Sequence, residues 1–454
     1  MNPAEALAYL HQLSQFGFQP GLDSTRRLAA AVGNPQDRLR FIHVAGTNGK
    51  GSTCAFLESV YRTAGFRAGL YTSPHLVRFG ERIQVGRHPL PDTTLARLVS
   101  ELRQKMPADL QPTFFEFTTV VALMAFAEAA VDLVIWETGL GGRLDATNIV
   151  TPMASVITSI GLDHMQVLGG TVGEIAAEKA GIIKPGIPIL TSVDRADALA
   201  VIQYRARELD AHCVVVDAAA VGRMTLPVSL LGPHQRVNAT LAVVTVRLLR
   251  AFLPVSDEHL AHGLANTRWA GRMQVFQRGE QTWLLDGAHN ADGVAAFRRA
   301  LSDHFPERHP VMVLGMLRDK AWREMATHLA PAASRLVVAP VSSPRTVQAD
   351  ELRQALQEAH CGRAVRACAS VDEALRAVAR EPFIAVTGSL YFIGEVLERL
   401  GLATPNDPND PNDPDTLACP TDSCGTIETS GTQATGGIST HQRQLNEWAP
   451  PPPR

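Results

Sequence analysis

Short apolar runs alternate with longer segments of helical pattern through the first part of the chain. The apolar runs span residues 41–45, 132–137, 154–160 and 187–190. Strands that are apolar on both faces are typical of a parallel sheet, because each crossover connection places a helix against the sheet. The pattern therefore predicts a mostly parallel α/β domain, which we assign to residues 1–270.

A similar alternation continues in the next part of the chain. The apolar runs here lie at residues 282–286, 311–315, 335–339 and 383–387, and one intervening helical pattern covers 347–358. Strands that alternate with helices again indicate an α/β layout. We therefore predict a second, smaller, Rossmann-like α/β domain over residues 271–402.

The segment 403–454 has a different composition. Asn406-Asp407-Pro408 is repeated twice, a stretch rich in Ser, Thr and Gly follows, and four prolines precede the last residue. Such a composition cannot bury a hydrophobic core. We expect this tail to be disordered, although its proline run could instead dock into an aromatic groove of a partner.

Composition and charge exclude several classes of function. The chain has 454 residues, of which 45% are hydrophobic, and a formal net charge of -3. Nucleic-acid binding usually needs a basic field, which this charge does not supply, so we expect no nucleic-acid partner. The sequence also has no apolar run of about 18 residues and no signal-peptide pattern. We expect a cytoplasmic monomer without a membrane partner.

A glycine-rich stretch, residues 46–53, lies between the first apolar run and a helical pattern. Glycines allow the backbone to fold closely around phosphate oxygens, and the N–H groups at a helix N-terminus point at the anion. Lys50 would add a positive charge near the terminal phosphates, and Ser52 or Thr53 a hydroxyl near a metal ion. This order of elements predicts a nucleotide-phosphate site.

The stretch departs from the usual P-loop pattern at two positions. Val44 stands where the first glycine is expected, and Gly51 is inserted after Lys50. A tight surface turn is the alternative interpretation.

Three polar residues stand at or just after the carboxyl ends of apolar runs. This is the edge at which open α/β sheets bind their ligands. Glu137 ends the run 132–137 and is suited to Mg²⁺, although a solvated acid at a strand end is the alternative. His164 follows the run 154–160; from its chemistry alone it is a catalytic or structural histidine, because Mg²⁺ prefers oxygen ligands. Asp286 ends the run 282–286 in the same way.

Four sequence blocks in the same order resemble one known family. They are Gly46-Thr47-Asn48-Gly49-Lys50-Gly51-Ser52, Tyr71-Thr72-Ser73-Pro74-His75-Leu76, Gly139-Leu140-Gly141-Gly142-Arg143-Leu144-Asp145-Ala146-Thr147-Asn148 and Asp286-Gly287-Ala288-His289-Asn290. The family is that of folylpolyglutamate synthase and dihydrofolate synthase, within the Mur ligase group. The resemblance covers about residues 1–400, and it implies a P-loop-containing first domain like the central domain of Mur ligases.

The reaction that this resemblance implies is the ATP-dependent addition of L-glutamate to a carboxylate through an acyl phosphate. The acid would be dihydropteroate, a reduced folate, or both, and we expect a bifunctional enzyme. A carboxylate is a poor acyl donor until its oxygen becomes part of a phosphate leaving group. Because the carboxylate and the phosphate of ATP are both anions, cations have to reduce the repulsion between them.

The resemblance also implies roles for individual residues. ATP would contact Thr47, Asn48, Gly49, Lys50, Gly51, Ser52, Asn238, Arg272 and Asp286. Two Mg²⁺ ions would be held by Ser73, Glu137 and His164. The catalytic residues would be Lys50, Lys179 and His289, with Lys179 carbamylated so that it becomes an anion near the second metal ion.

The pterin acid would bind to three stretches of the chain. These include residues 18–20 and the side chains of Thr113, Phe115, Leu144, Asp145 and Ala146. The early loop, residues 21–26, departs from the family pattern Gly-Leu-Glu-Arg. We further expect Asp286 and His289 to meet Lys50 and Glu137 when two domains close, which would keep water from the acyl phosphate.

Each role has a simpler structural alternative. Lys179 could be a solvated helix lysine, Asn238 or His289 a helix cap, Arg272 an exposed side chain at a domain junction, and Phe115 part of the core.

Two other functions compete for the whole chain. Another Mur-type ligase would need a nucleotide-sugar domain before the phosphate loop, where only about 40 residues stand. A P-loop kinase or NTPase would account for Lys50 but not for the block around Asp286.

Overall fold

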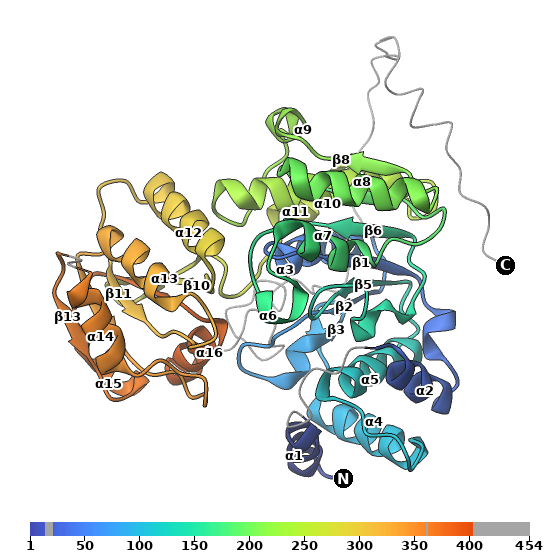
Figure 1. The fold of residues 1–454 in the computed structure, drawn as a ribbon, viewed down its shortest axis with the longest axis horizontal. Coiled ribbons are helices and arrows are strands. Elements are labelled where there is room, and N and C mark those ends of the chain that lie inside the picture. The colour runs from blue at the N-terminus through green and yellow to red at the C-terminus, as the bar shows by residue number, and fades with distance from the viewer. Residues whose placement is uncertain (14–20, 360–361, 403–454) are drawn as a thin grey trace, which may run out of the picture.

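The structure, a computed structural model, describes residues 1–13, 21–359 and 362–402. Over these residues the chain forms two sheets with helices on both faces, and the two sheet domains lie side by side (Figure 1). The predicted tail, 403–454, and the predicted pterin stretch 18–20 lie outside the described residues. None of the described helices is long and apolar enough to span a bilayer.

The first sheet has eight strands within the described residues, in the order β4-β3-β2-β5-β1-β6-β7-β8. The strands from β2 to β8 in this order pair in parallel, whereas β3 and β4 pair antiparallel at one edge. Their bounds are β1 Phe41–Ala45, β2 Ala68–Tyr71, β3 Ile83–Val85, β4 His88–Pro89, β5 Leu133–Glu137, β6 Ala154–Ile157, β7 Ile189–Thr191 and β8 Cys213–Val215.

Helices cover both faces of this sheet because its central strands are buried on both sides. In β1, Phe41 packs against a core that includes α1, α2, α4 and α5, whereas Ile42 and Val44 pack against α3, α10 and α11. The helices are α1 Pro3–Leu13, α2 Asp23–Ala31, α3 Lys50–Thr63, α4 Asp92–Lys105, α5 Phe114–Glu128, α6 Met165–Leu168, α7 Val172–Ala180, α8 Ala196–Glu208, α9 Ala218–Arg223, α10 Pro233–Leu249 and α11 Asp257–Ala265. Short 3₁₀ turns cover Pro35–Arg38, Phe79–Arg82 and Ala146–Ile149.

The second sheet has six strands in the described part of the chain, in the order β13-β12-β11-β14-β10-β9. All its pairings are parallel except that of β9 with β10. The strands are β9 Gln274–Arg278, β10 Gln281–Asp286, β11 Val311–Leu314, β12 Arg335–Val338, β13 Val365–Ala367 and β14 Phe383–Thr387. The helices are α12 Ala291–His304, α13 Trp322–Leu329, α14 Ala349–Glu358, α15 Val371–Ala377 and α16 Leu390–Arg399, with a 3₁₀ turn at Ala330–Ala332.

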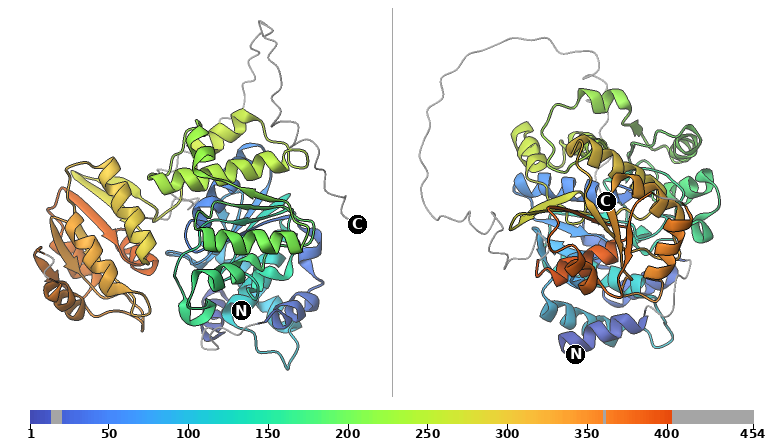
Figure 2. Two further views of the ribbon diagram at one scale, coloured as in Figure 1. Left: turned by 45° about the horizontal axis from the view of Figure 1, so that its top comes forward. Right: turned by 90° about the vertical axis from the view of Figure 1, so that its left-hand side faces the viewer.

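The predicted fold class is confirmed, since both halves are α/β and both sheets are mostly parallel. The division into domains near residue 270 stays a prediction; this position lies between α11 and β9. Figure 2 shows the second sheet and its helices as a separate body beside the first. The site lies between these two bodies, where the loops after β1, β5, β6 and β10 line one cavity.

Candidate active site

The glycine-rich loop connects β1 to α3, as its sequence predicts. Thr47 N donates to Ser159 O at 2.7 Å, and Asn48 N donates to Ser159 Oγ at 3.1 Å. Lys50 is the first residue of α3, and its Nζ donates to the carbonyls of Gly46 and Thr47 at 3.0 and 3.3 Å. The segment after β6 therefore fixes the loop from outside, while the lysine ammonium lies against the backbone that would surround a phosphate.

Two glycines of this loop have no room for a side chain. Gly49 has φ 85°, and a Cβ there would lie 2.4 Å from Oδ1 of Asn238. At Gly46 a Cβ would lie 1.9 Å from Oγ1 of Thr158. Both positions require glycine because the backbone passes against polar side chains, and the left-handed φ of Gly49 adds a second reason.

Lys179 lies near the end of α7 and is buried. Its Nζ donates to Gly46 O at 2.8 Å. Burial, together with the charge of Lys50, lowers the pKa of Lys179 to about 7. A substantial fraction of the side chain is therefore a neutral amine at physiological pH, and the alternative of a solvated helix lysine is wrong.

Glu137 ends β5, lines the cavity and is buried. Its Oε2 accepts a hydrogen bond from Ser73 N at 2.9 Å. Burial raises the pKa of Glu137, and the nearby ammonium of Lys50 opposes the rise. Two of the three predicted metal ligands thus lie together, and the alternative of a solvated strand-end acid is wrong.

His164, the third predicted metal ligand, has different neighbours. It lies in a left-handed conformation before α6, and 43% of its side chain is exposed. Lys320 Nζ lies 3.2 Å from His164 Nε2. In the parts of the chain that the structure describes, no three or more His, Cys, Asp or Glu residues are grouped in a way that could hold a metal ion.

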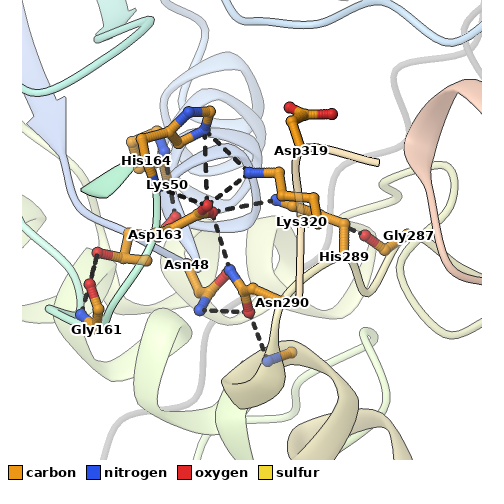
Figure 3. A network of polar contacts seen from close by, with 12 residues as sticks. Asn48, Lys50, Gly161, Asp163, His164, Gly287, His289, Asn290, Asp319 and Lys320 are labelled. Atoms are coloured by element: carbon orange, nitrogen blue, oxygen red, sulfur yellow. Dashed lines mark hydrogen bonds and ion pairs between the residues drawn. The ribbon is translucent and has the colours of Figure 1, made fainter. Parts of the chain in front are cut away.

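A polar network joins the two domains beside the phosphate loop (Figure 3). The side-chain amides of Asn48 and Asn290 exchange hydrogen bonds of 3.3 and 3.0 Å. Asn290 Nδ2 also donates to Asp163 Oδ2 at 3.2 Å, and Lys320 Nζ donates to Asp163 Oδ1 at 2.5 Å. The ammonium of Lys320 holds the pKa of Asp163 well below its usual range against the effect of burial. The two domains are therefore in direct contact at the site.

His289 lies on the second domain in the same network. Its Nδ1 is 2.8 Å from Gly287 O, so Nδ1 carries the proton and Nε2 keeps a lone pair. Nε2 lies 3.8 Å from Asp163 Oδ2. Burial lowers the pKa of His289 to about 4, which keeps the ring neutral. The helix-cap alternative is wrong, because the side chain of Asn290 caps α12.

Asp286 and Arg272 lie together where the second domain begins. The carboxylate of Asp286 accepts hydrogen bonds from Met273 N and Ala288 N, each at 2.9 Å. Burial raises the pKa of Asp286, while the guanidinium of Arg272 acts in the opposite direction. Arg272 is half-buried and lines the cavity, so the alternative of an exposed junction arginine is wrong.

Asn238 lies inside α10 rather than at its N-terminus, so it is not a helix cap. Its Nδ2 donates to Gln235 Oε1 at 3.0 Å, and its carbonyl oxygen faces Gly49.

The predicted pterin residues form another wall of the cavity. Thr113 caps α5 and exchanges hydrogen bonds with Glu116. Phe115 lines the cavity and also packs against the core, so both of its predicted environments are present. Asp145 is tied inward, because it accepts hydrogen bonds from Leu140 N and from the backbone and hydroxyl of Thr147. Its carboxylate therefore shapes the loop over residues 140–147.

One cavity of about 930 Å³ brings these walls together. The predicted site residues that line it are Thr47, Asn48, Gly49, Lys50, Gly51, Ser52, Ser73, Thr113, Phe115, Glu137, Leu144, Asp145, Ala146, His164, Lys179, Asn238, Arg272, Asp286 and His289. Their individual roles stay predictions. The volume is large enough for more than one small molecule at a time.

Sequence reasoning missed four residues of this site. Asp163 precedes the predicted His164, and Asn290 follows the predicted His289. Their carboxylate and amide groups could therefore have been identified as site residues from the sequence. Lys320 and Arg82 carry no local pattern that distinguishes them from surface cations. Only the fold places them at the cavity.

Comparison with known proteins agrees with this arrangement. Residues 44–202 match the Mur ligase middle domain, and residues 271–390 match the glutamate ligase domain of Mur ligases. The chain is therefore an ATP-dependent ligase of the Mur group.

Close relatives identify the family within this group. The chain is 37% identical over 428 residues to the dihydrofolate synthase/folylpolyglutamate synthase of Bacillus subtilis, covering 87% of this chain and 98% of the relative. It is 33% identical to the Escherichia coli enzyme of the same name, covering 87% and 94%. The chain belongs to the dihydrofolate synthase/folylpolyglutamate synthase family.

Solved structures show the same likeness. The structure of E. coli FolC in complex with DHPP and ADP has a TM-score of 0.79 and 31% identity, and the match covers 88% of this chain and 98% of the other. Folylpolyglutamate synthase of Mycobacterium tuberculosis, complexed with ADP and AMPPCP, has a TM-score of 0.80 and 27% identity, with coverage of 88% and 100%.

Proposed function

We propose that the cavity binds ATP and a pteroate or folate acid together, and that the enzyme joins L-glutamate to the carboxylate of that acid. The observation that carries this proposal is the contact between domains. The phosphate loop, Glu137 and Lys179 come from the first domain and face Asp286 and His289 across one cavity. A kinase or NTPase needs no such second wall, and the relatives cover both domains.

The chemistry begins with transfer of the γ-phosphate of ATP to a carboxylate oxygen of the acid. Lys50 would leave the carbonyls of Gly46 and Thr47 to neutralise the transferred group, and Arg272 would contact the phosphate from the other domain. The amino group of glutamate then attacks the acyl carbon, and phosphate leaves. We assign the Nε2 lone pair of His289 to orient this amine.

Magnesium fits one part of the site. The buried carboxylate of Glu137 beside Ser73 offers the oxygen ligands that Mg²⁺ prefers, and the phosphates of ATP can complete the coordination. Bound there, Mg²⁺ would neutralise charge on the phosphates. Coordination of a metal ion through Nε2 of His164 would require Lys320 to move away, because its ammonium lies 3.2 Å from that atom.

Carbamylation of Lys179 is supported by its chemistry in the site. A neutral amine reacts with carbon dioxide, and burial with the charge of Lys50 brings the pKa of Lys179 to about 7. The product is an anion, which would lie near Lys50 and strengthen a second cation site. A carbonyl ¹³C signal after incubation with ¹³C-bicarbonate, present in the wild type and absent in Lys179→Met, would support this assignment.

The test of the proposed function offers dihydropteroate and tetrahydrofolate separately, with ATP, Mg²⁺ and labelled glutamate. We expect label in both products, which is the bifunctional outcome. Label in neither product contradicts the assignment of the acid. Lys50→Ala should abolish both reactions while the protein stays folded. Monomeric state, cytoplasmic location and the lack of nucleic-acid and membrane partners stay predictions from the sequence.

A further inference from the structure

Arg82 is a buried cation that the chemistry described so far does not use. It ends the 3₁₀ turn Phe79–Arg82, is 8% exposed and lines the cavity. Its Nε donates to Nδ1 of His75 at 2.8 Å. Because the Nε–H group is the donor, Nδ1 of His75 is the acceptor, and this hydrogen bond fixes the plane of the guanidinium. The two terminal NH₂ groups remain available for another partner.

The nearby carboxylates do not serve as that partner. The groups that act electrostatically on Arg82 are the phenols of Tyr71 and Tyr391 and, among carboxylates, Glu81 and Glu137. The oxygens of Glu81 accept hydrogen bonds of 2.7–3.1 Å from the backbone of residues 76–78, and Glu137 accepts one from Ser73 N. Among the described residues, no hydrogen bond or ion pair joins the terminal nitrogens of Arg82 to an acceptor. A buried charge is normally paired, so an anionic ligand is the missing partner.

The position of Arg82 within the cavity restricts which anion this is. Its guanidinium lies 5.2 Å from the ring centroid of Phe114 and 5.7 Å from that of Phe79. Phe114 lines the cavity between Thr113 and Phe115, which are predicted to contact the pterin, whereas Glu137 is the carboxylate proposed to hold Mg²⁺ beside the phosphates. Arg82 thus faces the part of a bound acid between its aromatic ring and its reacting carboxylate.

We propose that Arg82 binds the carboxylate that does not react when the acid substrate already carries a glutamate. This inference rests on the proposed function. A folate that accepts a further glutamate has two carboxylates at its end, one that is activated and one that is not, whereas dihydropteroate has only the reacting one. The planar fork of arginine matches a carboxylate through two parallel hydrogen bonds. Arg82 is then a specificity-determining residue, which favours glutamylated acids and contributes little to dihydropteroate binding.

The experiment measures kcat and KM for tetrahydrofolate and dihydropteroate with Arg82→Met, which keeps an apolar stem against Phe114. Loss of a charge-assisted hydrogen-bond pair predicts a KM for tetrahydrofolate that is about 10- to 100-fold higher. The KM for dihydropteroate should change by less than about twofold. Arg82→Lys keeps the charge without the fork, so an intermediate KM is expected. Arg87→Met is the matched control, because Arg87, in the turn between β3 and β4 that follows, is equally buried but does not line the cavity.

A second measurement does not depend on the folding of the variant. The wild type is offered a tetrahydrofolate whose non-reacting carboxylate is converted to an amide. It should bind this amide about 10- to 100-fold more weakly than tetrahydrofolate itself. The inference is overturned if Arg82→Met raises the KM values of both acids equally, or raises neither. It is also overturned if the wild type binds the amide as tightly as tetrahydrofolate. A wild type that glutamylates dihydropteroate alone also overturns it, whereas one that uses neither acid refutes the proposed function itself.

Discussion

Replacing Lys320 by methionine tests whether contact between the two domains controls catalysis. The Lys320 to Asp163 pair has an N···O distance of 2.5 Å, and the side chains are 11% and 10% exposed. Removing one partner of a buried pair costs about 3–5 kcal/mol, because the remaining charge is left without compensation. Here the molecule can avoid much of this cost by separating its domains, which hydrates Asp163.

We therefore expect Lys320→Met to lower the catalytic rate rather than the folding stability of either domain. Taking the lower end, about 3 kcal/mol, kcat/KM for glutamate addition should fall by about 100-fold. The melting temperature should change by no more than a few degrees. Asp163→Asn removes the charge that Lys320 compensates. The double variant of Lys320→Met and Asp163→Asn should therefore have a kcat/KM about tenfold higher than the product of the two single effects predicts.

The matched control is Arg318→Met, which removes an ion pair to Glu351 from the same loop. That pair is 52% and 30% exposed and lies within one domain, so solvent screens it and its loss should leave both the melting temperature and kcat/KM nearly unchanged. Unaltered kcat/KM in Lys320→Met, or independent effects in the double variant, would show that the interdomain pair does not act in catalysis.

Further predictions concern the phosphate loop and the buried side chain of His43. Gly49→Ala should raise the Kd for ATP at least about tenfold by calorimetry, because a left-handed φ costs about 1–2 kcal/mol and the Cβ would displace Asn238; unchanged affinity contradicts the close approach. Burial lowers the pKa of His43 to about 3, from 6.5 when unfolded. The unfolded chain therefore binds an extra proton below pH 6.5, and the stability present above this pH is lost as pH falls. His43→Gln should reduce the slope of unfolding free energy between pH 6 and 4 by about 1.4 kcal/mol per unit, in urea titrations; an unaltered slope contradicts this.

The sequence predicted the central strands well for a physical reason. β1 and β14 have the predicted bounds because strands buried on both faces are continuous apolar runs. The edge strands β3 and β4 were not predicted. They have three and two residues, too few for an alternating pattern to show.

The candidate site was predictable where its residues stand at the ends of strands or in glycine-rich loops. Glu137 and the phosphate loop are of this kind, because strand order alone brings them to one edge of the sheet. Lys320 was not predictable, since it meets Asp163 across 157 residues of sequence. Arg82 was missed because its burial depends on the packing of Phe79 and Phe114, which no local pattern encodes.

If the acid is activated as an acyl phosphate, one of its carboxylate oxygens must leave with the phosphate, and an isotope label can follow that oxygen. Dihydropteroate labelled with ¹⁸O in both carboxylate oxygens would be incubated with the enzyme, ATP, Mg²⁺ and glutamate, and the released phosphate analysed by mass spectrometry. Because the amine displaces phosphate from the acyl carbon, we expect one ¹⁸O in phosphate for each amide formed. Amide formation with unlabelled phosphate would contradict it.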